Sequence, residues 1–383
     1  MILLMVNLTD LERTLCELIE LPSINPSLKC DDQTLTGEEK IAAYLESRAA
    51  QVGISSKRMK VLPGRDNLLL SIRPRGKVRS RIILAPHMDV VPAPKTSFKP
   101  KRKKGRIYGR GACDTKGSMT AFFHAFLKIA QNGTIPQNTE ILFIGLVDEE
   151  FSQAGSRKLS QKGPPADLAI AGEPTSLQVV SAHKGNLWIR LKTKGKAAHG
   201  STPQYGVNAI EKMTPVVRLI SRAYQDFLKR KTHPLLGHPT VNIGKIQGGI
   251  QPNVVPETCE IDIDRRTLPG ETDLMVEAEI KKLLRLHKVN IPEFSVSRSV
   301  PCPPLDTNQN LPAVQAFLKA ANRRKTVGVP YFTDAAPIAM GGTPALVYGP
   351  GNIAQAHALD EWVAIKELEK AEACIFRFLN SLP

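Results

Sequence analysis

Residues 81–92, RIILAPHMDVVP, carry an apolar segment directly into two polar side chains with metal-binding chemistry. The continuous apolar run 82–84 is typical of a strand buried on both faces, as in a parallel sheet covered by helices. His87 and Asp89 follow at the carboxyl end, where open α/β sheets place their sites. Because the two residues are two apart on an extended chain, their side chains project to the same side. The stretch predicts that His87 ligates a metal while Asp89 orients its ring, although His-x-Asp alone also fits a satisfied polar pair.

Other predicted strands are also followed by side chains that can bind a metal. Residues 140–147, EILFIGLV, run into Asp148-Glu149-Glu150, and residues 168–171 run into Gly172-Glu173-Pro174. The segment GRGACDTKG leads into an apolar helix over 118–130, so Asp114 lies near a helix start. Nitrogen and hard oxygen donors without thiolates suit two divalent metal ions that share one carboxylate, with zinc as the expected metal. The candidate ligands are His87, Asp114, Glu150, Glu173 and His357.

Composition limits the class of protein. A chain of 383 residues is long for one core, so two domains are expected, and 42% hydrophobic with 23% charged residues indicates a soluble globular protein. The six cysteines are scattered without a Cys-x-x-Cys pair, which indicates reduced thiols and no disulfide framework. The apolar start Met1–Val6 is too short for a signal peptide, and no stretch reaches the length of a membrane span. These features predict a cytoplasmic protein that is not bound to a membrane.

The formal net charge of +16 raises the question of a nucleic-acid partner. The densest basic run, residues 99–106 (KPKRKKGR), has no interleaved aromatic residues and belongs to no recognisable nucleic-acid module. It also contains a proline and a glycine, so we expect a solvated loop and no nucleic-acid binding. The charge can still attract anionic substrates. A non-catalytic basic binding protein is the alternative from another class, and the complete ligand set argues against it.

The remaining pattern predicts the order of elements. Capping boxes at Thr9-x-x-Glu12 and Thr36-x-x-Glu39 open two helices, and strands follow at 68–73 and 81–85. From residue 179 the predicted order of elements is β-α-β-β-α-β, which is typical of a ferredoxin-like domain and indicates an insertion. Its predicted elements are a strand at 186–193, a helix at 207–228, strands at 240–247 and 256–265, a helix at 272–287 and a strand at 293–298. A helix at 311–322, a strand at 345–348 and a closing helix from Asp360 complete the chain.

Several motifs resemble one enzyme family over essentially the whole chain. HMDVVP, GRGxxDxKG, the Glu-Glu pair after a strand, GEP and the terminal Ala-His are similar to the co-catalytic zinc amidohydrolases that include acetylornithine deacetylase, succinyl-diaminopimelate desuccinylase, aminoacylase and carboxypeptidase G. The resemblance implies an α/β fold: a mixed, mainly parallel sheet covered by helices, as in zinc peptidases, with an inserted α+β ferredoxin-like lid and dimerisation domain. The implied parts are a catalytic domain at 1–178 and 300–383 and the lid at 179–299.

The resemblance also implies roles for the candidate ligands. Asp114 would bridge two Zn²⁺ ions, which Co²⁺ could replace. One ion would be completed by His87 and Glu173, and the other by Glu150 and His357. A non-proline cis peptide bond is implied between Asp114 and Thr115.

Further residues match positions that act on substrate in this family. Glu149 would be the general base for a metal-bridging hydroxide. His199, in AAHGS, would reach the active site of a partner subunit and stabilise the oxyanion, which implies a homodimer formed through the lid. Asn253 and Arg266 would bind substrate, since a guanidinium can hold a carboxylate through two parallel hydrogen bonds. The turn containing Gly342 would offer backbone donors to substrate, or be an ordinary turn.

The implied function is hydrolysis of an N-acyl amino acid. The ending GPGNIAQAH-x-x-DEW is more similar to acetylornithine deacetylase than to the desuccinylase, whose threonine-serine-aspartate pattern is absent around residues 331–334. A desuccinylase is the first alternative, and a carboxypeptidase or dipeptidase is the second.

Overall fold

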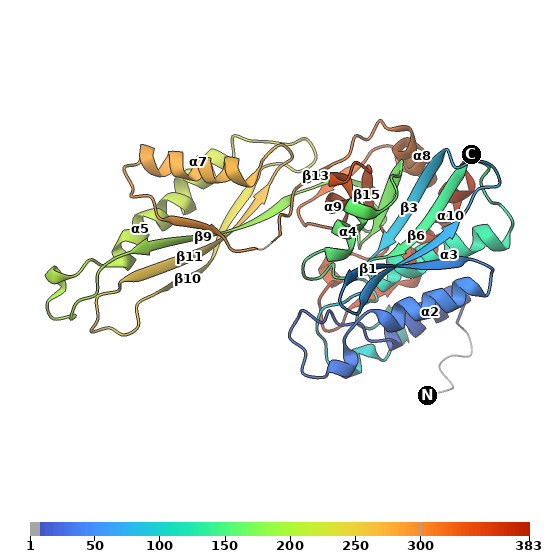
Figure 1. The fold of residues 1–383 in the computed structure, drawn as a ribbon, viewed down its shortest axis with the longest axis horizontal. Coiled ribbons are helices and arrows are strands. Elements are labelled where there is room, and N and C mark those ends of the chain that lie inside the picture. The colour runs from blue at the N-terminus through green and yellow to red at the C-terminus, as the bar shows by residue number, and fades with distance from the viewer. Residues whose placement is uncertain (1–7, 299) are drawn as a thin grey trace. The chain divides into compact units, whose positions relative to one another are not determined.

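The computed structural model in Figure 1 describes residues 8–298 and 300–383, so the apolar start Met1–Val6 lies outside the described residues. The chain divides into two compact units. The first contains the chain up to Ser181 together with Thr307–Val327 and Thr333–Pro383, and the second contains Ala182–Asp306 and Gly328–Phe332. No helix within the described residues is both long and apolar enough to cross a membrane.

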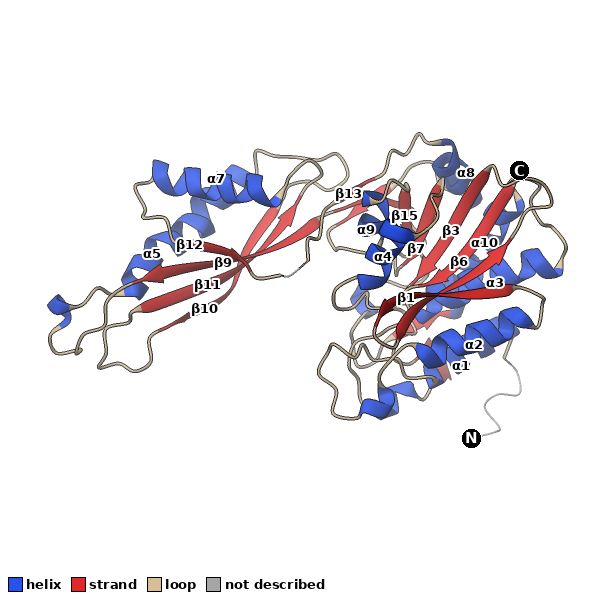
Figure 2. Ribbon diagram, viewed as in Figure 1, coloured by secondary structure: helices blue, strands red, loops and turns tan. Residues whose placement is uncertain are grey.

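A mixed sheet with a parallel centre organises the first unit. Its central strand β3 pairs in parallel with β6 and β7, and β7 pairs in parallel with β15, whereas β1, β2 and β6 pair antiparallel. Every residue of β6, β7 and β15 is buried, so helices cover both faces there, as Figure 2 also shows. The predicted mainly parallel α/β fold is confirmed. In spatial order the strands are β1 (Ser55–Leu62), β2 (Arg65–Ile72), β6 (Thr139–Gly145), β3 (Ser80–Pro86), β7 (Leu168–Gly172) and β15 (Ala345–Tyr348).

The helices of this unit supply the rest of its core. Helix α3 is buried along most of its length, and it packs against β3 and β6 on one side and α10 on the other. The ring of Phe123 meets that of Phe143 edge-on at 5.4 Å between centroids. The helices are α1 (Asp10–Glu20), α2 (Glu39–Ala50), α3 (Lys116–Gln131), α4 (Ala154–Lys162), α8 (Pro312–Ala320), α9 (Ala335–Met340) and α10 (Ile365–Asn380), with short 3₁₀ helices at Gln33–Leu35, Lys95–Phe98 and Ile353–Gln355.

One of the two predicted capping boxes is present. The backbone amide of Glu12 donates to the Thr9 hydroxyl at 3.2 Å, and the Thr9 amide donates to the Glu12 carboxylate at 2.9 Å. The box at Thr36 is wrong, because the Thr36 hydroxyl donates to a carbonyl of the preceding 3₁₀ helix. The residue before α2 is Glu38, and its side chain forms no cap because its carboxylate binds the buried Arg65.

The basic run at 99–106 is a hairpin and not the loop we predicted. Strands β4 (Lys101–Lys103) and β5 (Arg106–Tyr108) turn at Lys104 and Gly105, both with positive φ, and β16 (Trp362–Ala364) pairs with β5. The resulting sheet has the order β16-β5-β4. Because β16 occupies 362–364, the closing helix begins at Ile365 and not at Asp360.

The second unit has the expected element order β-α-β-β-α-β. Its antiparallel sheet has the strand order β10-β11-β9-β12. Alternating burial along β11 shows that one face of the sheet is covered, with α5 and α7 in the same core. The predicted helix 207–228 is interrupted by a π-helical turn at Ile220–Tyr224. The elements of this unit are β9 (Gly185–Lys194), α5 (Ala209–Leu219), α6 (Gln225–Leu228), β10 (Thr240–Gly248), β11 (Thr258–Thr267), α7 (Asp273–Leu286) and β12 (Glu293–Val296), with a 3₁₀ helix at Pro203–Tyr205. Three short strands lie where the chain passes from one unit to the other: β8 (Val180–His183), β13 (Leu305–Asp306) and β14 (Val327–Val329).

Candidate metal centre

The five expected ligands all belong to the first unit and follow its central strands. His87 and Glu173 come directly after the neighbouring strands β3 and β7, and Glu150 lies five residues after the end of β6; the carboxyl ends of these three strands meet at one edge of the sheet. The other two lie at the start of α3 and in the loop between β15 and β16. In chain order these residues are His87, Asp114, Glu150, Glu173 and His357.

The two carboxylate oxygens of Asp114 face two different histidines. Its Oδ1 lies 3.1 Å from Nε2 of His87, and its Oδ2 lies 3.3 Å from Nε2 of His357. A second carboxylate accompanies each histidine: Glu173 lies 3.9 Å from His87, and Glu150 lies 3.1 Å from His357. This arrangement allows one carboxylate to be shared by two cations, each completed by one histidine and one further acid.

Two overlapping sets of donor atoms are close enough to hold an ion. The ligand atoms of His87, Asp114 and Glu150 lie within 4.8 Å of one another, and so do those of His87, Glu149 and Glu173. Glu149 therefore lies at ligand distance itself. Its position beside the candidate ligands is the one that a proton-transferring carboxylate would need.

The electrostatics of the cluster fit a site for cations. Burial, together with the neighbouring acids, raises the pKa of Glu149 and Glu173 well above the ordinary glutamate value. Burial also raises the pKa of Glu150 to about 7, and its Oε1 is buried without a hydrogen-bond partner among the described residues. Burial opposes ionisation of Asp114 as well, but hydrogen bonds from His357 and His87 lower its pKa. Packed acids with an orphaned oxygen and two imidazoles fit a site for divalent cations.

Asp89 contacts the His87 ring most closely through its backbone carbonyl. The Nδ1 of His87 lies 3.0 Å from the backbone carbonyl of Asp89 but 3.6 Å from its carboxylate, which is beyond a hydrogen bond. The carboxylate instead accepts the backbone amides of Glu149 at 3.1 Å and Glu150 at 3.0 Å. The side-chain amide of Asn25 also donates to it, at 2.7 Å. Asp89 thus fixes the backbone of both functional glutamates, and the backbone at position 89 orients the His87 ring.

Sequence reasoning missed Glu361, a buried acid that shapes the loop before α3. Its carboxylate accepts the backbone amides of Gly111, Cys113 and Asp114 at 2.8–2.9 Å and the Arg110 guanidinium at 2.6 Å. Burial raises its pKa, an effect that the amide of Asp114 opposes. The position of Glu361 four residues after His357 was the available signal, but the sequence does not reveal which loop it binds.

Asn25 and Asp334 were also missed. Asn25 donates to Asp148 at 3.1 Å as well as to Asp89, so it joins the segments that follow β3 and β6. Asp334 accepts a hydrogen bond from Ser156 of α4, and its Oδ2 is buried without a partner among the described residues. Burial raises the pKa of Asp334 to about 7.

The peptide bond between Asp114 and Thr115 is cis, as the resemblance implies. The Thr115 hydroxyl donates to the carbonyl of Gly172, one residue before the candidate ligand Glu173, at 2.8 Å. The segment with Asp114 is therefore tied to the end of β7.

The predicted substrate-binding residues of the second unit lie on two adjoining loops and a strand. His199 forms an isolated bridge with Val254, and the amide of Gly200 donates to the carbonyl of Asn253 at 2.7 Å. His199 is exposed, with Nδ1 2.7 Å from the Ser201 hydroxyl. Arg266, on β11, donates from Nε and Nη2 to Asp264 at 2.8 and 3.1 Å.

Gly342 does not offer the backbone donor that we considered. Its amide donates to the carbonyl of Ala339 at 3.0 Å, and the amide of Gly341 donates to that of Ile338 at 3.0 Å. Gly342 has φ of +87° and ends α9 as an ordinary turn. The Gly342 amide is therefore already used within the turn.

An α/β fold with histidines and carboxylates at the carboxyl ends of its parallel strands is an arrangement that suits a metal-dependent hydrolase. Residues 83–381 match peptidase family M20/M25/M40, and the chain belongs to this family. It is 30% identical over 362 residues to an acetylornithine deacetylase of Vibrio cholerae serotype O1, covering 90% of this chain and 92% of that protein.

Solved structures share the fold. The aminopeptidase PepT of Bacillus cereus matches with a TM-score of 0.79 at 22% identity over 97% of both chains. A dinuclear metal-binding peptidase of the M20 family from Bacillus subtilis matches with a TM-score of 0.70 at 15% identity, over 97% of this chain and 96% of that one. The chain is a hydrolase of this family, which includes a dinuclear metal-binding peptidase.

Proposed function

We propose that the chain removes the acyl group from an N-acyl amino acid, with N-acetylornithine as the first substrate to test. The observation that carries the proposal is Asp114, whose two oxygens face two histidines that are each accompanied by a further acid. Acetylornithine deacetylase relatives at about this identity support the substrate class. A succinyl substrate or a peptide remains the alternative, since the same donor set serves any amide.

The proposed chemistry is hydrolysis with Glu149 as general base. Two divalent ions at this site, Zn²⁺ in our proposal with Co²⁺ able to replace it, would polarise the scissile carbonyl and acidify the attacking water. Glu149 takes a proton from that water and passes it to the nitrogen of the leaving amine as the C–N bond breaks. The oxygen of the water remains in the released carboxylate, and Asp89 keeps Glu149 in place through its backbone amide.

Asn253 and Arg266 are proposed to bind the free α-carboxylate of the substrate. Arg266 already holds a carboxylate, that of Asp264, through two hydrogen bonds, which is the geometry such binding requires. The substrate would compete with Asp264 for the guanidinium. Arg265 is a weaker candidate because its side chain is fully buried and bound to Glu271.

We further propose that residues 179–299 form a lid that dimerises the enzyme, with His199 acting in the partner's site. Exposure of His199 is compatible with a contact outside its own chain. Mixing His199→Ala chains with Glu149→Ala chains tests this, because a heterodimer then contains one site with both residues intact. Verified heterodimers without recovered activity would place His199 in its own site or outside catalysis.

The function is tested by a hydrolysis screen of zinc-loaded protein against N-acetyl, N-succinyl and peptidyl substrates. We expect N-acetylornithine to have the highest kcat/KM, with Glu149→Ala as the inactive control. Preference for a succinyl or peptide substrate would reject the deacetylase assignment but retain the hydrolase. Loss of all activity on every amide would reject the proposed function itself.

A further inference from the structure

The three-stranded sheet β16-β5-β4 presents one face that no part of the proposed reaction uses. Strand pairing sets Lys101 opposite Tyr108 and Tyr108 opposite Trp362, and it sets Lys103 opposite Arg106. Residues that pair directly across strands share a face. The other face carries Ile107, which is fully buried, so these basic and aromatic side chains form the outer face.

Lysines from one edge of this sheet line a cavity of about 390 Å³. Lys99, Lys101 and Lys103 alternate along the chain and therefore project to the same side. Tyr108 and Asp360 also line the cavity. Its volume lies within the range of small-molecule pockets.

The positive charge in this cavity is not neutralised by the protein. Across residues 8–298 and 300–383, no carboxylate forms an ion pair with any of the three lysines, whereas Arg102 on the opposite face is paired with Glu12 at 2.8 Å. Glu361 also reaches the cavity wall, but its carboxylate is occupied by Arg110 and three backbone amides. The lysines are therefore free to bind an anionic ligand.

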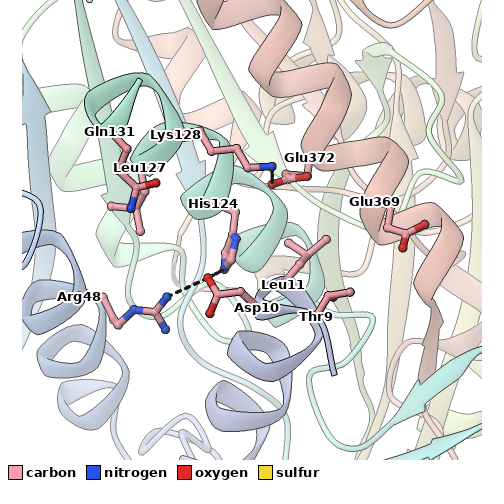
Figure 3. A pocket seen from close by; sticks show the side chains of 10 residues that line it. All are labelled: Thr9, Asp10, Leu11, Arg48, His124, Leu127, Lys128, Gln131, Glu369 and Glu372. Carbon is pink, nitrogen blue, oxygen red and sulfur yellow. Dashed lines mark hydrogen bonds and ion pairs between the residues drawn. The ribbon is translucent and has the colours of Figure 1, made fainter. Parts of the chain in front are cut away.

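A second pocket shows the contrasting case. Figure 3 shows a pocket lined by α1, α2, α3 and α10 in which Arg48 faces Asp10 at 3.3 Å and Lys128 faces Glu372 at 2.5 Å. Its cations are already compensated by neighbouring acids, so an incoming anion would have to displace them. The lysine cavity requires no such exchange.

The aromatic residues limit the kind of anion. Tyr108 is the aromatic residue that lines the cavity. Trp362 does not line it, and one face of its ring is covered by the Arg106 guanidinium at 3.7 Å. One ring beside three lysines suits a single planar base attached to phosphates, while a nucleic-acid strand needs successive stacking rings. A carboxylate such as Asp360 would repel a bare phosphate, but it can accept hydrogen bonds from ribose hydroxyls.

We propose that this cavity binds a free nucleoside phosphate, with the lysines on the phosphates, Tyr108 on the base and Asp360 on the ribose. The site lies outside the candidate metal centre and does not depend on the proposed deacylase activity. The basic run 99–106 does not reveal the site in the sequence, because Tyr108 lies just beyond the run and Asp360 lies in a distant part of the chain.

The test is calorimetric titration of the metal-loaded protein with ADP, pyrophosphate and adenosine at low and high salt. We expect ADP to bind more tightly than either pyrophosphate or adenosine, and we expect the affinity for ADP to fall as the salt concentration rises. Lys101→Glu with Lys103→Glu should weaken ADP and pyrophosphate by about tenfold or more, because charge-assisted hydrogen bonds are lost. Tyr108→Leu should lower the affinity for ADP and leave the affinity for pyrophosphate unchanged.

Lys104→Glu is the matched control for Lys101→Glu alone, since each reverses one charge on the same hairpin but Lys104 does not line the cavity. It should have a much smaller effect than Lys101→Glu. Equal effects would reduce the site to a general attraction by net charge, and undiminished ADP binding in the double variant would place the ligand elsewhere, including at the metals. An oligonucleotide that binds more tightly than ADP would replace the proposal with a strand-binding surface.

Discussion

Replacing Glu361 by Gln should weaken metal binding at Asp114 without unfolding the chain. One oxygen of Glu361 accepts Arg110 and Gly111, and the other accepts the amides of Cys113 and Asp114. The side-chain nitrogen of Gln is a donor. Whichever oxygen it replaces, two buried donors lose their acceptor and Arg110 loses its charge partner.

The magnitude follows from these contacts. A buried donor without an acceptor costs about 1–3 kcal/mol, and removing one member of a buried ion pair costs about 3–5 kcal/mol. Because the substituted side chain retains one accepting oxygen, we expect a loss of about 3–5 kcal/mol in the free energy of unfolding. Residues that orient metal ligands typically contribute about 10–100-fold to metal affinity, or about 1.4–2.7 kcal/mol.

Competition with a chromophoric chelator measures the metal affinity of Glu361→Gln, and thermal melting of the metal-free protein measures its stability. Glu271→Gln is the control, because the Glu271 carboxylate also accepts a backbone amide, that of Leu268 at 2.8 Å, and a buried guanidinium, that of Arg265 at 2.7 Å, but lies in the second unit, which holds none of the five candidate ligands. Metal affinities of Glu361→Gln and Glu271→Gln that agree within about twofold would refute the argument that Glu361 positions the bridging ligand.

Three further outcomes are expected. Glu149→Ala should keep both metals but lose turnover by about 10²–10⁴-fold, whereas Glu150→Ala should also lose metal, as elemental analysis and kinetics would show; the reverse pattern would exchange the two roles. Asp89→Asn should lower metal affinity and turnover together, since an amide cannot accept the backbone N–H groups of both glutamates; a change in turnover alone would contradict this. Burial lowers the pKa of His183 to about 4, so the unfolded chain gains a proton below about pH 6.5 that the folded chain does not. This one group should therefore remove ~1.4 kcal/mol of stability per pH unit as pH drops from about 6.5 to 4, and chemical denaturation should show the free energy of unfolding of the unaltered chain falling by that amount relative to His183→Asn over the same range.

The residues that sequence reasoning located best are those whose position depends on local pattern. His87 and Glu173 directly follow an apolar strand and Glu150 follows another by five residues, and the strands of one parallel sheet end at a common edge, so the structure brings these residues together as expected. The central strands were recognisable for the same reason, because a fully buried strand is a continuous apolar run.

Residues that depend on tertiary pairing could not be located in this way. Nothing near Glu361 in the sequence indicates that it accepts amides some 250 positions away. Asn25 is similar, since it joins two acids from different strands. The basic run 99–106 does not reveal its hairpin, because strands of three residues are too short for an alternation to be visible and the third strand, β16, lies far along the chain.

The contact between Glu361 and the loop before α3 also bears on how the protein is made. Synthesis delivers the loop with Asp114 long before it delivers Glu361 and His357, so the amides at 111, 113 and 114 lack their acceptor until the last part of the chain has emerged. A nascent chain therefore holds only part of the ligand set, in a loop that has not been fixed. A metal centre that needs both Asp114 and His357 could form only after the carboxyl-terminal segment has folded back, and a truncated product ending before residue 357 would lack one of its five candidate ligands.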